Sequence, residues 1–167
     1  MIVYLASDHA GFKLKERVKG FLIREGYEVQ DLGASEYNKD DDYPDFISKA
    51  GEAISRSPED KAIIFGGSGQ AEAIVANKYK QVRAAVFYAP AIPAEAADVT
   101  GRVSEDPFEM IRLTREHNNA NVLSLGARFL KEEEATQAVQ LWLKAPFSQE
   151  GRHVRRIDKI KKIEEGS

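Results

Sequence analysis

Short apolar runs alternate with helix-like segments along the chain, and this alternation restricts the fold more than any other feature. Five segments are strand candidates, at residues 2–6, 27–32, 62–65, 82–87 and 121–125, and those at 2–6 and 62–65 are continuously apolar. Segments with helical spacing lie between and after them, at residues 12–24, 43–56, 70–79, 108–116 and 131–143. Strands that alternate with helices form a parallel sheet covered on both faces. The sequence therefore predicts an α/β fold: a three-layer, doubly wound, Rossmann-like five-stranded parallel sheet.

A long connection and a C-terminal helical extension complete what a length of 167 residues predicts to be a single domain, residues 1–167. The connection, at about 88–106, follows the fourth strand, is rich in proline, and is expected to hold a short irregular helical piece. Loops this long in a compact domain are usually functional or mobile. The C-terminal helix, at about 152–163, has an apolar stripe that must pack on its own domain or on a partner chain: Val154, Ile157, Ile160 and Ile163.

Composition excludes several classes of function. The chain has no cysteine, so it has no disulfide, no thiolate chemistry and no cysteine metal site. A formal net charge of −3 gives no general attraction to nucleic acid or to an anionic membrane. No apolar run approaches the roughly 20 residues that span a bilayer, and the first strand is too short for a signal sequence. We therefore expect a cytoplasmic protein that binds neither nucleic acid nor membrane.

Three glycines and a serine, residues 66–69, separate the third strand from its helix. Glycine lets a ligand approach the backbone, and free N–H groups at a helix start bind anions. Glu72 follows in the first helical turn, and proton transfer with a developing oxyanion would explain an acid in such a place. Alternatively, Ser68 is a turn residue and Glu72 a favourable charge at the helix dipole. The nucleotide-binding fingerprints G-x-G-x-x-G and G-x-x-x-x-G-K-[ST] do not occur.

Other polar residues are expected to join this turn, because ligands of open α/β sheets bind outside the carboxyl ends of the strands. Asp8 and His9 follow the first strand, which neighbours the third in the usual doubly wound orders. They can therefore share a crevice with the glycine turn, and Tyr43, after the second strand, would border it. Taken singly, Asp8 is as readily a turn residue and His9 a surface histidine.

His117 lies just before the fifth strand, at the edge of the sheet opposite this crevice. It is either a helix C-terminal cap or a contribution to the site of a neighbouring subunit. Arg152 and Arg156 are four residues apart on one face of the last helix, with His153 beside them. Two guanidinium groups on one face suit a phosphate clamp, although a solvated basic face would look the same.

Together these residues resemble the ribose-5-phosphate isomerase B family, which also includes galactose-6-phosphate isomerase subunits. The resemblance covers nearly the whole chain. Its motifs are Ser7-Asp8-His9-Ala10-Gly11-Phe12-Lys13-Leu14-Lys15, Asp41-Asp42-Tyr43-Pro44, Gly66-Gly67-Ser68-Gly69 with Ala76-Asn77-Lys78, Arg115-Glu116-His117-Asn118-Asn119-Ala120, Gly126-Ala127-Arg128, and Gly151-Arg152-His153 through Arg155-Arg156-Ile157.

The resemblance implies an enzyme that interconverts an aldose phosphate and a ketose phosphate through a cis-enediolate, with no metal and no cofactor. Some members use a cysteine base, whereas this chain resembles the branch in which a glutamate, here Glu72, moves the proton between C1 and C2. Ser68 and the N–H groups of the turn around Gly67 and Gly69 would hold the enediolate oxygen. His117 would assist ring opening.

The resemblance also implies substrate-binding residues and an oligomer. Asp8 would orient the sugar hydroxyls, with Asn118 beside the enediolate and Tyr43 beside the sugar. The phosphate would be bound by Arg128, Arg152 and Arg156, with His9 as a further candidate. The position of His117 then predicts a homodimer whose active sites are shared between subunits.

Two departures from the family keep alternatives open. Ala71 stands where members commonly have glycine, and the 88–106 connection is longer than usual by roughly a dozen residues. The connection could cover the site, change sugar selectivity or extend the dimer interface. Ribose 5-phosphate is the expected substrate. The alternatives are a hexose 6-phosphate, from allose or galactose, and a sugar-phosphate-binding protein without catalysis. A nucleotide-binding protein of similar fold would rest on fold analogy alone.

Overall fold

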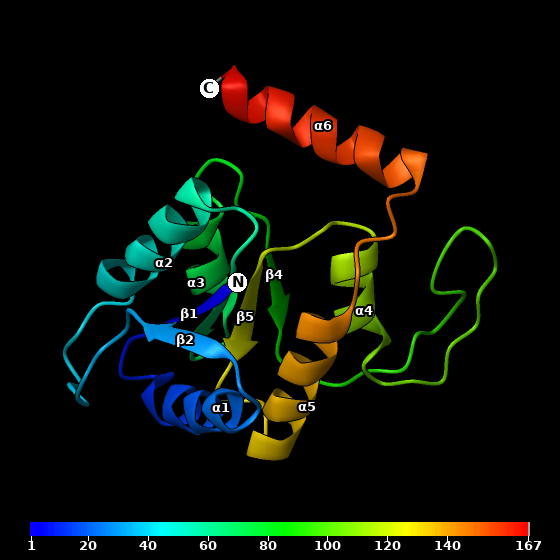
Figure 1. Cartoon of the computed structure of the whole chain (residues 1–167). Helices are drawn as coiled ribbons and strands as arrows, with labels where there is room; N and C mark the ends of the chain where they lie inside the picture. The colour runs from blue at the N-terminus through cyan, green and yellow to red at the C-terminus, as the bar shows by residue number, and fades with distance from the viewer. Residues whose placement is uncertain (167) are drawn as a thin grey trace.

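The computed structural model describes residues 1–166 and forms one five-stranded sheet between two layers of helices (Figure 1). All four strand pairings are parallel, and the strand order is β2-β1-β3-β5-β4. The predicted doubly wound α/β fold is confirmed. The strands are β1 (Ile2–Ser7), β2 (Glu28–Asp31), β3 (Lys61–Gly66), β4 (Ala84–Phe87) and β5 (Val122–Gly126).

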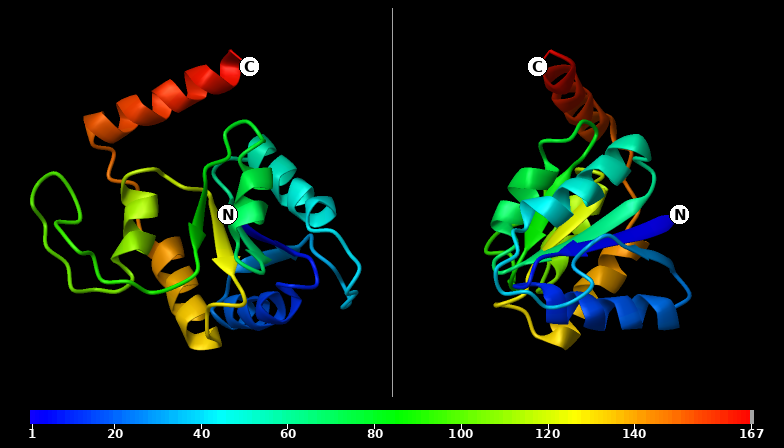
Figure 2. Two further views of the ribbon diagram at one scale, coloured as in Figure 1. Left: turned by 180° about the vertical axis from the view of Figure 1, so that it is seen from behind. Right: turned by 90° about the vertical axis from the view of Figure 1, so that its left-hand side faces the viewer.

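The helices divide between the two faces of the sheet (Figure 2). One face is covered by α1 (Phe12–Arg24), α4 (Glu109–Glu116) and α5 (Glu132–Lys144), and its core includes Trp142. The other is covered by α2 (Pro44–Arg56) and α3 (Gln70–Ala76), with a smaller core around Ile47. Every residue of β3 is buried, which explains why its sequence is apolar without alternation.

The third helix and the fourth strand are both shorter than predicted at the turn that joins them. The third helix ends at Ala76 rather than Tyr79, and the fourth strand begins at Ala84 rather than Val82. A tight turn occupies the residues between them, where the Val82 N–H group bonds to the carbonyl of Tyr79. Apolar residues in that turn are buried or half-buried, so their pattern looked like a continuation of both elements.

The long connection after β4 contains no helix between residues 88 and 106, so the predicted helical piece is wrong. Proline disfavours helical backbone at the residue before it, and Ala89 and Ile92 both precede prolines. Two backbone bonds shape the segment instead, from Ala91 N–H to the Pro107 carbonyl (2.9 Å) and from Ala97 N–H to the Arg102 carbonyl (2.7 Å).

Ion pairs attach this connection to α4. Arg102 lies 2.9 Å from a carboxylate oxygen of Glu109 and 3.1 Å from one of Glu116. Figures 1 and 2 show the segment beside α4 at the β4 edge of the molecule. The part of the connection around Arg102 therefore packs on a helix rather than over the glycine turn.

The last helix, α6 (Gly151–Glu165), stands away from the two helical layers (Figure 1). It crosses the edge where the strands begin, and the Gln81 N–H group bonds to Glu164 there (3.0 Å). A groove of about 450 Å³ separates it from the start of β4, with Ile160 among its lining residues. Val154 and Ile160 of the predicted stripe remain 38% and 46% exposed. Within residues 1–166, no helix is long and apolar enough to cross a membrane.

Candidate active site

A cavity of about 400 Å³ opens at the carboxyl edge of the sheet, where β1, β3 and β5 end side by side. Each strand contributes the turn that follows it. Its lining residues are Asp8, His9, Ala10, Gly67, Ser68, Ala71, Glu72, Arg128 and Phe129. The structure thus brings six of the predicted site residues, from three separate motifs, around one space.

The glycine turn shapes the floor of this cavity. Gly69 has a positive φ of 77°, which glycine adopts without strain, and a Cβ there would lie 3.0 Å from the Leu125 backbone. A Cβ on Gly66 would lie 1.8 Å from Oε1 of Glu72. Glycine at the end of β3 is therefore what lets the Glu72 carboxylate rest against the backbone.

The Glu72 side chain enters the cavity from the first turn of α3 and is only 4% exposed. Burial raises its pKa, the nearby Asp8 charge adds to this, and its own backbone N–H group acts in the opposite direction. A carboxylate with a raised pKa is a stronger base than an exposed one. Glu72 is thus better suited to accept a proton than an exposed glutamate.

Asp8 and Ser68 face the same space. Asp8 is 5% exposed and accepts a hydrogen bond from the Ala10 N–H group (2.9 Å), so it forms the expected turn as well as lining the cavity. Ser68 is half-buried, and its hydroxyl is 3.4 Å from the Gln70 N–H group. Ala71 lies inside α3, where alanine adopts the backbone without strain, so its methyl group does not distort the turn.

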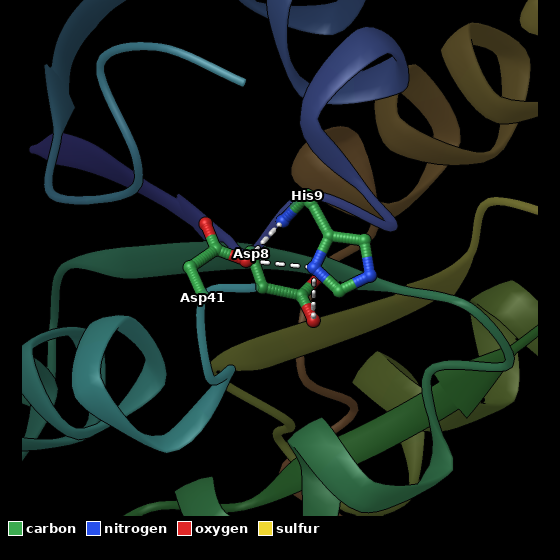
Figure 3. Close-up of side chains that lie close together, drawn as sticks. All are labelled: Asp8, His9 and Asp41. Carbon is green, nitrogen blue, oxygen red and sulfur yellow. Dashed lines mark hydrogen bonds and ion pairs between the residues drawn. The ribbon is translucent and has the colours of Figure 1, made fainter. Parts of the chain in front are cut away.

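His9 is held by two carboxylates (Figure 3). Its Nδ1 lies 2.7 Å from Oδ1 of Asp41 and 3.8 Å from Oδ2 of Asp8. The hydrogen bond to Asp41 raises the pKa of His9, burial opposes it, and the Asp8 charge raises it further. Imidazole and carboxylate groups this close can also surround a metal ion, yet the Nδ1 atom is already engaged by Asp41. Ion pairing therefore accounts for the cluster.

Arg128 supplies a guanidinium group to the cavity from the turn after β5. The backbone N–H group of Arg128 donates a hydrogen bond to the Gly67 carbonyl (3.1 Å). Its guanidinium carbon would be 3.4 Å from a Cβ on Gly67. The neighbouring Phe129 is 63% exposed at the rim, with its ring 6.1 Å from that of Tyr88. A positive group and an aromatic edge thus flank the glycine turn.

A second group of predicted residues lies at the opposite edge of the sheet. His117 ends α4, and its ring stacks on that of His153 at 4.2 Å between centroids. Arg152 contacts Glu150 (2.9 Å) and His153 (3.1 Å), while Arg156 on the same helix is exposed. Asn118 is exposed beside His117. These four residues, His117, Asn118, Arg152 and Arg156, do not reach the cavity of their own chain.

Tyr43 does not line the cavity as predicted; it packs against the core under α2. Asp41 and Phe129, in contrast, were not predicted to act at the site. Asp41 belongs to the motif Asp41-Asp42-Tyr43-Pro44, but the sequence does not show which of its two aspartates meets His9. Phe129 follows a motif residue, which was the available signal.

The structure and sequence are similar to those of known proteins along nearly the whole chain. The family model described as Ribose/Galactose Isomerase matches residues 3–101 and 102–160. Ribose-5-phosphate isomerase B of Mycolicibacterium paratuberculosis is 37% identical over 164 residues, covering 98% of this chain and 92% of that protein. The Escherichia coli ribose-5-phosphate isomerase B is 32% identical over 158 residues, covering 95% and 93%.

Solved structures agree with the sequence matches. The Mycoplasma genitalium ribose-5-phosphate isomerase B with bound ribulose 5-phosphate superposes with a TM-score of 0.85 at 34% identity, covering 99% of this chain and 97% of that one. The Clostridium thermocellum ribose-5-phosphate isomerase B has a TM-score of 0.83 at 39% identity, covering 99% of both chains.

Proposed function

This chain belongs to the ribose/galactose isomerase family and is an isomerase, and we propose that it interconverts ribose 5-phosphate and ribulose 5-phosphate. The observation that carries this proposal is the buried Glu72 carboxylate, which meets the glycine turn at the cavity. The relatives' shared name and the ribulose 5-phosphate bound to one of them support this choice of substrate.

In the proposed reaction, Glu72 removes the proton from C2 of the open-chain aldose, and the electron pair passes through the new C1=C2 bond of the cis-enediolate to the C1 oxygen. A proton then moves from the C2 oxygen to the C1 oxygen, and Glu72 returns its own proton to C1 as the C2 carbonyl of the ketose forms. A proton next to a carbonyl is a weak acid, so the developing oxyanion needs preorganised donors. Ser68 and the backbone N–H groups around Gly67 and Gly69 would supply them. Removing one such donor typically lowers kcat by about 10²–10³.

The rest of the substrate would be held by the flanking side chains. Asp8 accepts hydrogen bonds from the sugar hydroxyls, and Arg128 with His9 binds the phosphate. Contacts to the phosphate, which is remote from C1 and C2, hold the reacting carbons at the base. Tyr43 would contact the sugar with the part of its half-buried side chain that does not pack against the core.

One chain does not bring all the expected groups to its cavity, and this supports a homodimer with shared active sites. His117 and Asn118 lie at the amino edge of the sheet, as do Arg152 and Arg156 on α6. In the proposed dimer, these residues complete the partner's site. His117 assists ring opening, Asn118 contacts the enediolate, and the two arginines join Arg128 at the phosphate.

Two observations favour a pentose isomerase over the alternatives. Beyond Tyr88, whose ring lies beside Phe129 at the rim, the 88–106 connection packs on α4, which weakens the case that it reshapes the cavity for a hexose 6-phosphate. Ala71 is helical, which weakens the case for a non-catalytic binder. The test is to compare kcat/KM for ribose, allose and galactose phosphates and to follow solvent deuterium into C2. A hexose preference would overturn the substrate, and tight binding without exchange would overturn the reaction.

A further inference from the structure

We propose that Asp41 is a positioning residue that holds His9 as an imidazolium, with its Nε2–H group free to donate to the substrate phosphate. This inference rests on the proposed function, because it assumes that a phosphate occupies the cavity. It assigns a role to a loop residue that does not line the cavity itself.

The geometry is that of a two-point clamp. Oδ1 of Asp41 accepts a hydrogen bond from the His9 backbone N–H group at 2.9 Å and lies 2.7 Å from Nδ1 of the same residue. One carboxylate oxygen thus fixes both the backbone and the ring of His9 (Figure 3). The Asp41 side chain is only 9% exposed, so water competes little for this contact.

This clamp decides which ring nitrogen faces the ligand. With Nδ1 taken by Asp41, Nε2 is the remaining donor of a ring that lines the cavity. In neutral imidazole one nitrogen is a donor and the other an acceptor, whereas the imidazolium donates from both. A charge-assisted hydrogen bond to phosphate is shorter and stronger than a neutral one.

The surrounding charges favour the cation. Asp8 adds a second carboxylate, 3.8 Å from Nδ1, and the ring of Tyr37 approaches edge-on at 6.2 Å. Among the described residues that line the cavity, Arg128 is the one other cation. Its charge opposes a positive charge on His9, and it would itself bind an anion. The titratable and charged groups that face the ring are Asp8, Asp41, Tyr37, Glu72 and Arg128.

The test compares Asp41→Asn with Asp40→Asn. Asp40 is the neighbouring aspartate, 73% exposed and paired with Lys39, so its variant removes the same loop charge without touching His9. Loss of a charge-assisted contact predicts a roughly tenfold higher KM for ribose 5-phosphate in Asp41→Asn, with a smaller change in kcat. The alkaline limb of kcat/KM should move to lower pH, because the carboxylate that keeps His9 protonated is gone. Asp41→Glu should recover part of both effects.

NMR titration of the imidazole signals provides a readout that does not need turnover, with His9→Gln used to assign the signal. The pKa of His9 should fall in Asp41→Asn and stay at the parental value in Asp40→Asn. An unchanged His9 titration would overturn the proposal, and so would equal KM values for the two variants. If the chain does not isomerise the sugar, the proposed function fails separately. The affinity of inorganic phosphate, measured with the same variants, then decides the role of Asp41.

Discussion

At the scale of single residues, the site depends on one acid kept in an environment that disfavours its charge. Glu72 is buried beside Asp8, and both the burial and the like charge raise its pKa. The positive end of α3 favours the charged form and opposes this shift, but burial outweighs it. Gly66 is the residue that makes the burial possible, because any side chain there would displace the carboxylate.

Replacing Glu72 with glutamine should separate activity from stability. Loss of the base should lower kcat by about 10²–10⁴, with sugar phosphate still bound.

The effect on stability follows from the raised pKa of Glu72 in the folded state. Between the unfolded and the folded pKa the unfolded state holds fewer protons, so stability falls as pH rises through this range. Glu72→Gln should therefore raise Tm near neutral pH. Glu133→Gln, on the exposed start of α5, should change neither quantity. Residual isomerisation close to the parental rate would exclude Glu72 as the base.

At the scale of elements, the alternation of apolar runs predicted the sheet because each strand lies between two helical layers. It could not predict the path of the loop after β2, which places Asp41 against His9, since loop paths depend on tertiary contacts. The helix predicted within residues 88–106 failed for a related reason. Proline and the Arg102 ion pairs, rather than helical spacing, determine that segment.

A buried ion pair holds α1 against β2, next to the loop that carries Asp41. Lys15 is fully buried and lies 2.5 Å from Asp31, which also contacts Lys19 at 2.8 Å. Burial raises the pKa of Asp31, but the hydrogen bonds from the two lysines outweigh it and the net pKa is lowered. The stabilisation is therefore complete above the unfolded pKa of about 3.9 and is lost as pH falls through the lower folded value.

Asp31→Asn should cost about 2–3 kcal/mol in the free energy of unfolding at pH 7, because the buried Lys15 loses its shortest carboxylate contact and keeps only Glu16 (2.7 Å) and the Ala34 carbonyl (3.0 Å). Urea denaturation at several pH values measures this. The difference between parent and variant should shrink at acid pH. The exposed Asp158→Asn is the matched control, with an expected change below about 0.5 kcal/mol. A pH-independent difference would show that packing, not the ion pair, explains the loss.

The turn that presents His117 and Asn118 is fastened by Arg83. Its guanidinium group donates to the carbonyls of Asn118 (3.1 Å) and Asn119 (3.0 Å). Lysine lacks the planar fork that makes these contacts together, so Arg83→Lys should lower kcat/KM by roughly tenfold while the fold is retained. Arg155→Lys, exposed on α6, should leave it unchanged. Parental kinetics in Arg83→Lys would mean that this turn does not serve the reaction.

At the scale of the whole molecule, the residues proposed to form one site lie in two groups at opposite edges of one sheet. Parallel strands place all their carboxyl ends together, so residues before β5 cannot share a cavity with residues after β3 in the same chain. The proposed two-fold dimer would resolve this. The carboxyl edge of each sheet would then meet the amino edge of the partner's sheet, once at each of the two sites. The apolar side chains of α6 that remain exposed are consistent with a helix that reaches a neighbouring subunit.

Mixing two inactive variants tests this arrangement directly. Glu72→Gln removes the proposed base at one edge, and His117→Ala removes the proposed ring-opening group at the other. After co-refolding, a statistical mixture contains about half hybrid dimers, each with one intact site if the site is shared. The mixture should then recover roughly a quarter of the parental activity per chain, because only half of the dimers carry one working site of two. Separately refolded and then combined variants are the control. Inactivity of the co-refolded mixture, with dimers verified by light scattering, would show that each chain builds its site alone.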